Sequence, residues 1–477
     1  MIKVVNFLNN KWVRAAIPAL LIHCSVGTVY CWSTFKQSIA TQIGMSPFAV
    51  GWAFSLAIFF LGMSAAFAGR FVEKDVHKSS LIACLCFTVG MLGTGLCIKF
   101  LTGWAAMIGI YLFYGVIMGI GLGVGYLSPV KTLMLWFSDN KGLATGISIM
   151  GFGLAKAIAT PLMEYLQQYH GGVANMFILL SILYFFLMFL GHMLLRKPEG
   201  WVEPQTNEGF HVLSMFKEKQ FIGIWLMFFI NIHCGLMIIS YEKQILGVAF
   251  AAAASLPLIV SIVPSFTAGF NALGRIGYST LSDKLKERNS VYIGIFISCI
   301  LISAIMVLTN AVNGAANFAL SVIVIAFLLI VNAGYGGGFS TLPALLSERF
   351  GMKKISQIHG LALSAWAIAG LTGNNTSELI LNTTENYNYI IAVGLILYSV
   401  AIIICGVIVN TKSKYKTLVE KPAYMGMWRK WLAFLPSKQA VAGSNPVIPS
   451  MLKNELNRGY RIPWERPKQR RWSGCPS

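Results

Sequence analysis

The 477-residue sequence contains little charge, and acidic residues are the scarcest part of it. Asp, Glu, Lys and Arg together make up 11% of the residues, less than half the share in an average soluble protein, whereas apolar residues make up 56%. This balance excludes a soluble globular protein. The net charge of +20 does not indicate nucleic-acid binding, because 14 of the 37 Lys and Arg lie in residues 411–477 and the remaining chain lacks the polar surface that binding a phosphate backbone requires.

Motifs for metal binding, redox chemistry and hydrolysis are also missing. Eight of the nine cysteines fall in apolar stretches, where they pack as small apolar residues, and none shows zinc-site or Cys-x-x-Cys spacing. The sequence has no His-Glu-x-x-His or Gly-x-Ser-x-Gly motif. We therefore expect no metal, no cofactor and no catalytic residue, and an integral membrane enzyme is the weaker alternative.

Long apolar stretches recur along the whole body of the chain. Each is long enough to cross a hydrocarbon core of about 30 Å as a helix of about 20 residues, and the strict alternation of a barrel strand is absent. The sequence therefore predicts an all-α integral membrane protein with twelve transmembrane helices. Their approximate spans are 15–37, 48–68, 80–100, 104–128, 143–164, 173–195, 221–241, 255–281, 291–309, 317–341, 357–380 and 388–409.

The basic residues between these spans predict the topology. If the N-terminus is cytoplasmic, seventeen of these bases fall in cytoplasmic segments and only Lys36, Lys99 and Lys243 fall outside. The positive-inside rule then places both termini in the cytoplasm, in a plasma (bacterial inner) membrane. The first apolar run is too long for a cleaved signal peptide, and no Ala-x-Ala-like site follows it.

The chain divides into two similar halves. Residues 196–219 form the longest internal polar segment and separate a first lobe, 1–195, from a second, 220–410, and a basic, largely disordered tail, 411–477, follows. A shift of 210 places His23 and Glu73 on His233 and Asp283, and a shift of 214 places Gly123, Pro129 and Gly146 on Gly337, Pro343 and Gly360. This order favours a parallel duplication, typical of two-lobed transporters with a site near the membrane midplane, over chance matches among glycine-rich helices.

Three bases lie inside predicted spans, where a charge is costly and functional by default: Lys131, Lys156 and Arg275. Counted along the helix, Arg275 lies about 12 Å from the cytoplasmic edge and Lys156 about 22 Å, so both flank the midplane. The planar fork of Arg275 suits a carboxylate through two parallel hydrogen bonds. Snorkelling to the interface is the alternative, and it is strongest for Lys131.

Two loops at matching positions carry an acid followed by bases. The first contains Gly69, Glu73, Lys74 and Lys78, and the second contains Ser282, Asp283, Lys284 and Arg288. Together they resemble the loop signature of the major facilitator superfamily. Such an acid can hold a base or a neighbouring helix N-terminus in one conformer and release it in the other, or it can be a static topological anchor.

A narrower resemblance covers nearly the whole body. Its motif residues are Gly27, Tyr30, Trp32, Ser33 and Phe35 in span 1, residues 121–126, Pro129, Trp136, Phe137, residues 142–144, Gly146 and residues 151–153 in spans 4 and 5, and Asn271, Gly274, Arg275, Ser282 and Asp283 in span 8. These resemble the oxalate:formate antiporter family of facilitator-superfamily carriers. Ser138 departs from the family's usual Pro, and the loop after Asp283 lacks its usual Gly.

The resemblance implies an anion site in which the span 8 Arg, Arg275, works with a span 11 Lys inside an aromatic cage. Tyr30 and Tyr126 match cage positions, whereas Phe152, Tyr335 and Phe339 keep an aromatic side chain of changed identity. Trp366 stands where the family has Lys. One fixed charge in place of two favours a monocarboxylate such as formate, pyruvate or lactate over oxalate, unless Lys156 supplies the second charge.

His23 and His233 occupy matching positions in the first span of each half. A buried His can titrate near physiological pH, so both are candidates for proton coupling; a structural hydrogen bond inside the bundle is the favoured alternative. The glycines at 121, 123 and 125, and those at 334 and 336–338, indicate close helix packing rather than a phosphate loop, with hinging as an alternative.

The sequence thus predicts a secondary carrier of small carboxylates that works by alternating access. Exchange of one anion for another and proton-linked uptake both remain open, and a non-transporting membrane sensor is the alternative from another class. The expected partners are a small organic anion, the lipid bilayer and a proton or counter-anion, without nucleic acid, and the expected state is a monomer. In the tail, residues 424–435 suggest an interfacial helix on anionic lipid, and RNA contact by residues 460–472 is the weaker interpretation.

Overall fold

The computed structural model describes residues 10–199, 201, 211–251, 256–313 and 317–409, and all regular structure among them is helical. The predicted tail, including its interfacial helix, lies outside the described residues. The first lobe comprises η1 (Trp12–Ala16), α2 (Ile17–Val26), η2 (Gly27–Cys31), α3 (Trp32–Ile43), α4 (Pro47–Lys74), α5 (Val76–Phe100), α6 (Gly103–Ile110), η3 (Tyr111–Met118), α7 (Gly119–Trp136), α8 (Lys141–Tyr169) and α9 (Gly172–Leu194).

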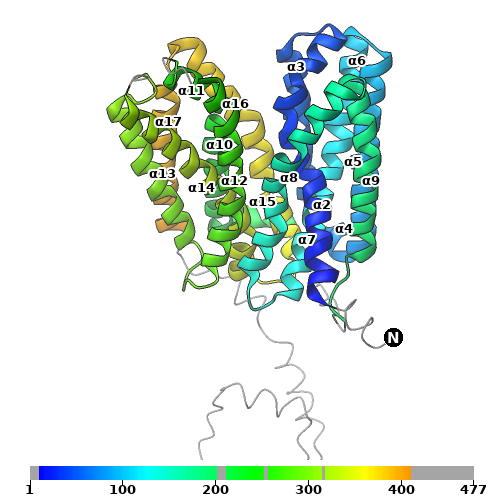
Figure 1. The fold of residues 1–477 in the computed structure, drawn as a ribbon. Coiled ribbons are helices and arrows are strands. Elements are labelled where there is room, and N and C mark those ends of the chain that lie inside the picture. Colours follow the sequence, from blue (N-terminus) through cyan, green and yellow to red (C-terminus); the bar gives the residue numbers. More distant parts are fainter. Residues whose placement is uncertain (1–9, 200, 202–210, 252–255, 314–316, 410–477) are drawn as a thin grey trace, which may run out of the picture. The chain divides into compact units, whose positions relative to one another are not determined.

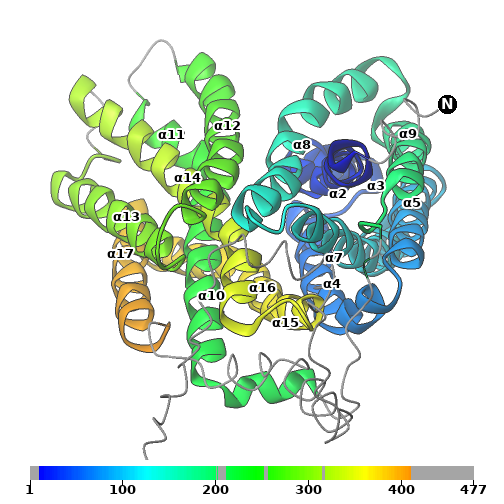
Figure 2. The same cartoon turned by 90° about the horizontal axis from the view of Figure 1, so that it is seen from below.

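The second lobe follows the short helix η4 (Val212–Lys217). It comprises α10 (Lys219–Ile239), α11 (Glu242–Ala249), α12 (Leu256–Ser282), α13 (Ser290–Thr309), α14 (Phe318–Phe350), α15 (Ile355–Ala362), α16 (Ser364–Thr384), α17 (Tyr387–Ile404) and η5 (Cys405–Val409). Figure 1 shows the two groups of helices side by side, and Figure 2 shows the same separation along the helix axes.

Eleven helical segments of the described chain are long and apolar enough to cross a membrane, and they correspond to eleven of the twelve predicted spans. The remaining predicted span, 357–380, is divided between α15 and α16, which together run from one end of the bundle to the other (Figure 1). It fails the same test because α16 carries a polar face. That face comprises Asn374, Asn375 and Glu378, and the further polar residues Thr372 and Thr376 lie on another side of the helix.

Several predicted spans are shorter than the helices that contain them. The span predicted at 104–128 belongs to a continuous helical segment, Gly103–Trp136, that passes through Pro129. The apolar run ends earlier than the helix because backbone hydrogen bonding continues beyond the most apolar residues. Neighbouring helices cover the site of Pro129, which makes a proline inside a spanning helix tolerable.

The first lobe meets the second mainly through α8 and α4. α8 packs against α12 and α14 of the second lobe, and α4 packs against α15 and α16. Both contacts reach the end of the bundle that carries the loops after α4, α7, α12 and α14. We call this the basic end, because Arg70, Lys74, Lys78, Lys141, Lys284 and Arg349 lie there, and we call the opposite end the far end.

Glycines permit the closest helix contacts inside the first lobe. A Cβ on Gly121 would meet the backbone of Ala83 and Phe87 in α5, and a Cβ on Gly123 would meet the Leu61 carbonyl in α4. α7 is thus held against two helices through its bare backbone. This geometry supports the packing interpretation of the glycine run.

Replacement of Gly123 by leucine should prevent folding of the first lobe. The new side chain would overlap the α4 backbone, and a backbone cannot move aside as a flexible side chain can. We expect loss of monodisperse protein in size-exclusion chromatography after detergent extraction. Gly277→Leu is the control, because a Cβ at Gly277 has open space around it; equal yields for both variants would contradict the packing argument.

Candidate functional site: a cavity between the lobes

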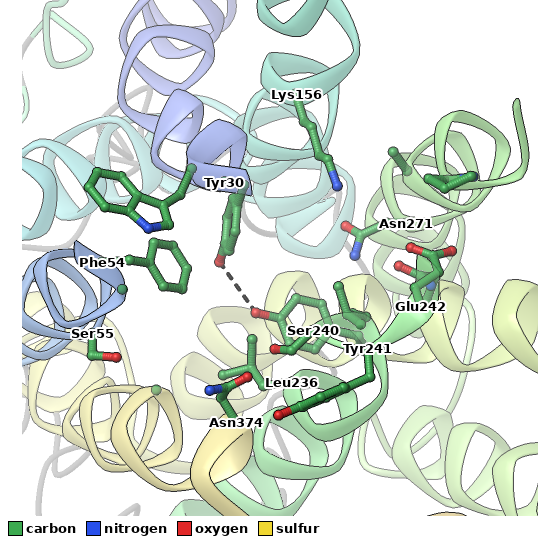
Figure 3. Close-up of a pocket in the computed structure, with 18 of the residues that line it drawn as sticks. Tyr30, Phe54, Ser55, Lys156, Leu236, Ser240, Tyr241, Glu242, Asn271 and Asn374 are labelled. Carbon is green, nitrogen blue, oxygen red and sulfur yellow. Dashed lines mark hydrogen bonds between the residues drawn. The ribbon is translucent and has the colours of Figure 1, made fainter. Parts of the chain in front are cut away.

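A cavity of about 460 Å³ lies between the two lobes. One face of α12 lines it at intervals of about one helical turn, through Pro264, Thr267, Asn271 and Arg275. The cavity extends from the far end, where Trp52 and Glu242 lie, towards Arg275. Figure 3 shows side chains from both lobes converging on this space. By volume it holds on the order of fifteen waters, so a small polar solute can enter with part of its hydration shell.

Arg275 is the most deeply placed of the cavity-lining residues of α12 and is 2% exposed. Its Nε donates to Asn271 Oδ1 at 2.8 Å, and one terminal nitrogen donates to the Ile149 carbonyl of α8 at 3.2 Å. Within the described chain, no carboxylate forms an ion pair with it. The guanidinium is therefore oriented by neutral partners, and its charge is available to an anion that enters the cavity.

Aromatic rings lie close to this guanidinium. Arg275 Cζ lies 6.0 Å from the ring centroid of Phe152 and 5.3 Å from that of Phe339, so both rings contribute cation–π attraction. The hydroxyl groups of Tyr30 and Tyr335 lie 3.3 Å apart, which joins the two lobes across the cavity (Figure 3). Tyr30, Phe152 and Tyr335 line the cavity directly.

Tyr126 and Trp366 lie behind this layer instead of lining the cavity. Trp366 is 1% exposed, and its ring centroid is 4.6 Å from that of Phe339 and 6.3 Å from that of Phe152. Tyr126 is fully buried, and its ring centroid lies 5.9 Å from that of Trp366. Trp366 thus supports the rings that face Arg275, and it does not touch the open space in this conformer.

Further charged side chains line the same cavity. Lys156 projects from α8 of the first lobe and is half-buried, as expected for the second candidate base. Sequence reasoning placed Lys36 on an external edge and did not single out Glu242 or Glu378, yet all three line the cavity. Lys36 and Glu378 lie within two residues of the ends of predicted spans and Glu242 directly follows one, so each resembles an ordinary residue at a helix end.

The two matched histidines are buried in the helix bundle and are absent from the cavity lining. His23 Nδ1 lies 2.5 Å from the Ser148 carbonyl and Nε2 lies 3.2 Å from the Tyr126 carbonyl. His233 Nδ1 lies 2.9 Å from Thr372 Oγ1. Both rings have structural hydrogen-bond partners, so the geometry favours the structural alternative over proton coupling.

The acids of the two loop motifs cap helices of the opposite lobe at the basic end. Asp283 accepts from the backbone N–H groups of Gly142 and Leu143 in the first turn of α8, each at 2.8 Å. α8 has no capping side chain of its own. An ionised carboxylate at a helix N-terminus satisfies otherwise unpaired N–H groups and complements the helix dipole.

Glu73 makes the reciprocal contact. It accepts from the Ser356 backbone N–H at 3.0 Å and from Gln357 Nε2 at 2.6 Å in the first turn of α15, which also lacks its own capping side chain. Gly69 lies against the same residues, where a Cβ would meet the Gln357 backbone. Lys131 interacts electrostatically with Glu73, so this base belongs to the basic-end contact and not to the cavity.

The bases that follow these acids have a different environment. Lys74 and Lys284 are exposed at the basic end, whereas Arg288 lies 2.7 Å from Asp283 and 3.3 Å from Glu348. Asp283 therefore holds both a helix terminus of the other lobe and a base of its own lobe.

No group of three or more His, Cys, Asp or Glu side chains that could hold a metal ion occurs within the described residues.

Comparison with known proteins agrees with this architecture. The chain is 25% identical over 388 residues to the oxalate:formate antiporter of Oxalobacter formigenes, which covers 79% of this chain and 86% of that protein. It is 22% identical over 465 residues to apicoplast pyruvate carrier 1 of Toxoplasma gondii, covering 76% of this chain and 82% of that protein. The predicted resemblance to oxalate:formate antiporters is thereby confirmed as a similarity over most of the chain.

Solved structures share the fold. A proton:xylose symporter of the same superfamily superposes with a TM-score of 0.65 at 15% identity, covering 85% of this chain and 98% of that one. The family model for the Major Facilitator Superfamily matches residues 18–374, which span both lobes, the cavity between them and both acid-containing loops. The chain therefore belongs to the major facilitator superfamily of membrane transporters.

Proposed function

We propose that this protein is a secondary active transporter of small monocarboxylates. The observation that carries the proposal is Arg275, a buried guanidinium without a carboxylate partner in the described chain, whose charge faces a cavity between the two lobes. A carboxylate can accept two parallel hydrogen bonds from such a fork, and the aromatic rings beside it suit a small apolar substituent. The similarity to a pyruvate carrier and to an oxalate:formate antiporter supports a carboxylate as the substrate.

The arrangement of the lobes supports transport by alternating access. We assign the basic end to the cytoplasm, following the positive-inside rule, so that the cavity faces the outside in this conformer. The helix caps at Asp283 and Glu73 hold the lobes together on the cytoplasmic side. Transport then requires that the cavity closes around the anion and that both caps break, which opens a path to the cytoplasm.

A second candidate function is exchange of oxalate and formate with Lys156 as the second base. Lys156 lines the cavity that contains Arg275, and no ion pair to it occurs in the described chain. A dianion could therefore meet two positive charges contributed by different lobes. Uptake of labelled formate, pyruvate, lactate and oxalate by the purified protein in liposomes tests both hypotheses and distinguishes the exchanger from the monocarboxylate transporter.

Wild-type protein should prefer monocarboxylates to oxalate by at least about tenfold, since a dianion enclosed beside one guanidinium keeps an uncompensated charge that costs several kcal/mol. Trp366→Lys should shift the preference towards oxalate, because position 366 lies directly behind the rings that face Arg275. The measurement is competition by unlabelled oxalate and pyruvate against labelled pyruvate.

Trp366→Phe is the matched control, because it keeps an apolar ring and adds no charge; it should retain the wild-type preference. Strong competition by oxalate in the wild type, abolished by Lys156→Ala, would refute the monocarboxylate proposal and support the exchanger.

A further inference from the structure

Glu242 is a buried carboxylate in the cavity wall. It has no role in the binding of an anion at Arg275. It is the first residue of α11 and is 4% exposed. Its Oε1 atom has no hydrogen-bond partner within the described chain. Figure 3 shows Glu242 on the second lobe, on the same side of the cavity as Asn271, with Lys156 reaching towards them from the first lobe.

The charges that act on Glu242 come from two bases. Lys156 belongs to α8 of the opposite lobe and faces the cavity, whereas Lys243 is the next residue in the chain and is exposed, so water screens its charge. The hydroxyl of Thr267 in α12 is a polar neighbour that also acts on this carboxylate, while it donates its own hydrogen bond to the Pro264 carbonyl at 3.0 Å. The other titratable groups that line the cavity are Lys36 of α3, Arg275 of α12, Glu378 of α16 and the tyrosines 30, 241 and 335.

Glu242 and an incoming carboxylate therefore compete for one ammonium group. Arg275 is oriented by neutral partners, whereas Lys156 shares the cavity with a carboxylate of the opposite lobe, Glu242, on which its charge acts. While Glu242 is ionised, its charge offsets that of Lys156 and opposes binding of a further anion. Once Glu242 is neutral, the ammonium is free to attract a substrate carboxylate.

We propose that Glu242 is the proton-binding site of the carrier, so that protonation of Glu242 removes the negative charge that offsets Lys156, and a proton and an anion are bound together. The proposal rests on the proposed function and selects proton-linked uptake over exchange as its coupling mode. The step is a proton transfer: an O–H bond of a hydronium ion in the external water breaks as an O–H bond to a carboxylate oxygen of Glu242 forms, and the same oxygen returns the proton to water after the lobes reorient.

The electrostatic interactions of Glu242 make proton binding and anion binding favour each other. Burial raises the pKa of the Glu242 carboxyl above its ordinary value, while the polar Thr267 hydroxyl and the charges of Lys156 and Lys243 oppose the rise. An anion bound at Lys156 offsets part of the Lys156 charge that lowers the pKa of Glu242. Anion binding therefore raises the pKa of Glu242 further and promotes its protonation. By linkage, protonation increases the affinity for the anion by the same factor.

Transport by Glu242→Gln provides the first test, because glutamine imitates the protonated acid and cannot release a proton. In proteoliposomes with an acidic exterior, wild type should accumulate labelled pyruvate against its gradient. Glu242→Gln should lose this accumulation and keep exchange of internal for external pyruvate. Glu164→Gln, which changes an exposed acid on α8 outside the cavity, should accumulate pyruvate like wild type.

Binding by detergent-solubilised protein provides a second test that does not require turnover. Quenching of tryptophan fluorescence can report pyruvate binding, because Trp32 and Trp52 line the cavity. Between about pH 5.5 and about 7.5 the carboxylate of pyruvate stays ionised. Wild-type affinity should fall as the pH rises, by up to about tenfold per pH unit, whereas Glu242→Gln should show a flat profile.

The outcomes distinguish this inference from the proposed function. Wild type that exchanges pyruvate without responding to the proton gradient, or Glu242→Gln that still accumulates pyruvate, would overturn the proton site and leave the carrier function intact. If Glu242→Gln loses exchange as well, the binding profile decides: a flat profile supports the proposal, and a profile like that of wild type overturns it. Absence of pyruvate transport by wild type in every mode would instead refute the proposed function.

Discussion

Arg275→Ala should reduce carboxylate uptake by more than about thirtyfold, the largest effect expected of any single substitution in the cavity. Loss of one partner from a buried, hydrogen-bonded charge pair costs about 2 to 5 kcal/mol, and the substrate anion would enter a site without its deepest positive charge. Arg275→Lys keeps the charge and loses the planar fork, so uptake should recover only in part. The measurement is initial uptake of labelled pyruvate into proteoliposomes.

The argument requires that the variants remain folded, because Arg275 also joins α12 to α8 through the Ile149 carbonyl. Thermal unfolding in detergent should be measured beside uptake for both variants. Lys286→Ala removes an exposed base from the loop after α12 and should transport like wild type. Uptake at the wild-type level in a folded Arg275→Ala protein would disprove the assignment of the anion site.

Simultaneous replacement of Glu73 and Asp283 by alanine should move the carrier out of the conformer seen here. The pair supplies charge-assisted hydrogen bonds to the first turns of α15 and α8, and such bonds contribute roughly 1.5 to 3 kcal/mol each. Loss of both contacts should change the ratio of conformers by more than about tenfold. Transport should fall, because one half of the cycle becomes unfavourable.

Labelling of a cysteine at position 55 by a membrane-impermeant thiol reagent measures this shift. Ser55 lines the cavity, so Ser55→Cys should react from the far end in an otherwise wild-type protein and react more slowly in the double variant. Asp75→Ala is the matched control: Asp75 accepts from the His77 and Lys78 N–H groups at the start of α5 in its own lobe. Its loss should lower stability by about 1 kcal/mol and leave the labelling rate unchanged.

Much of the fold follows from the sequence because a membrane imposes a local requirement. About 20 apolar residues suffice to predict a spanning helix, and eleven such helices occur where they are expected. The division of the span predicted at 357–380 could not be foreseen, since it depends on packing against α4 and α10. Arg275 was foreseeable because a base in an apolar span is costly without a role.

Other parts of the site depend on contacts between distant residues. Glu242 follows an apolar span like any loop acid, and the approach of α8 from the other lobe adds the charge of Lys156 to that of the neighbouring Lys243. Trp366 stands where the family has the Lys of the anion site, but it lies behind Phe339 because α15 and α16 place it in the second layer of rings. The family resemblance left the distance of Trp366 from the cavity undetermined.

The polar face of α16 has a consequence for biosynthesis. Asn374, Asn375 and Glu378 line the cavity, so the water that hydrates a substrate also hydrates this helix. A helix with such a face enters lipid unfavourably on its own, whereas α17 has the composition of an independent span. Membrane insertion of α16 therefore depends on α4 and α10, which are synthesised earlier and pack against it. Mutations on the facing surfaces of those two helices should consequently cause misinsertion and degradation of the nascent chain, even where they leave every substrate contact intact.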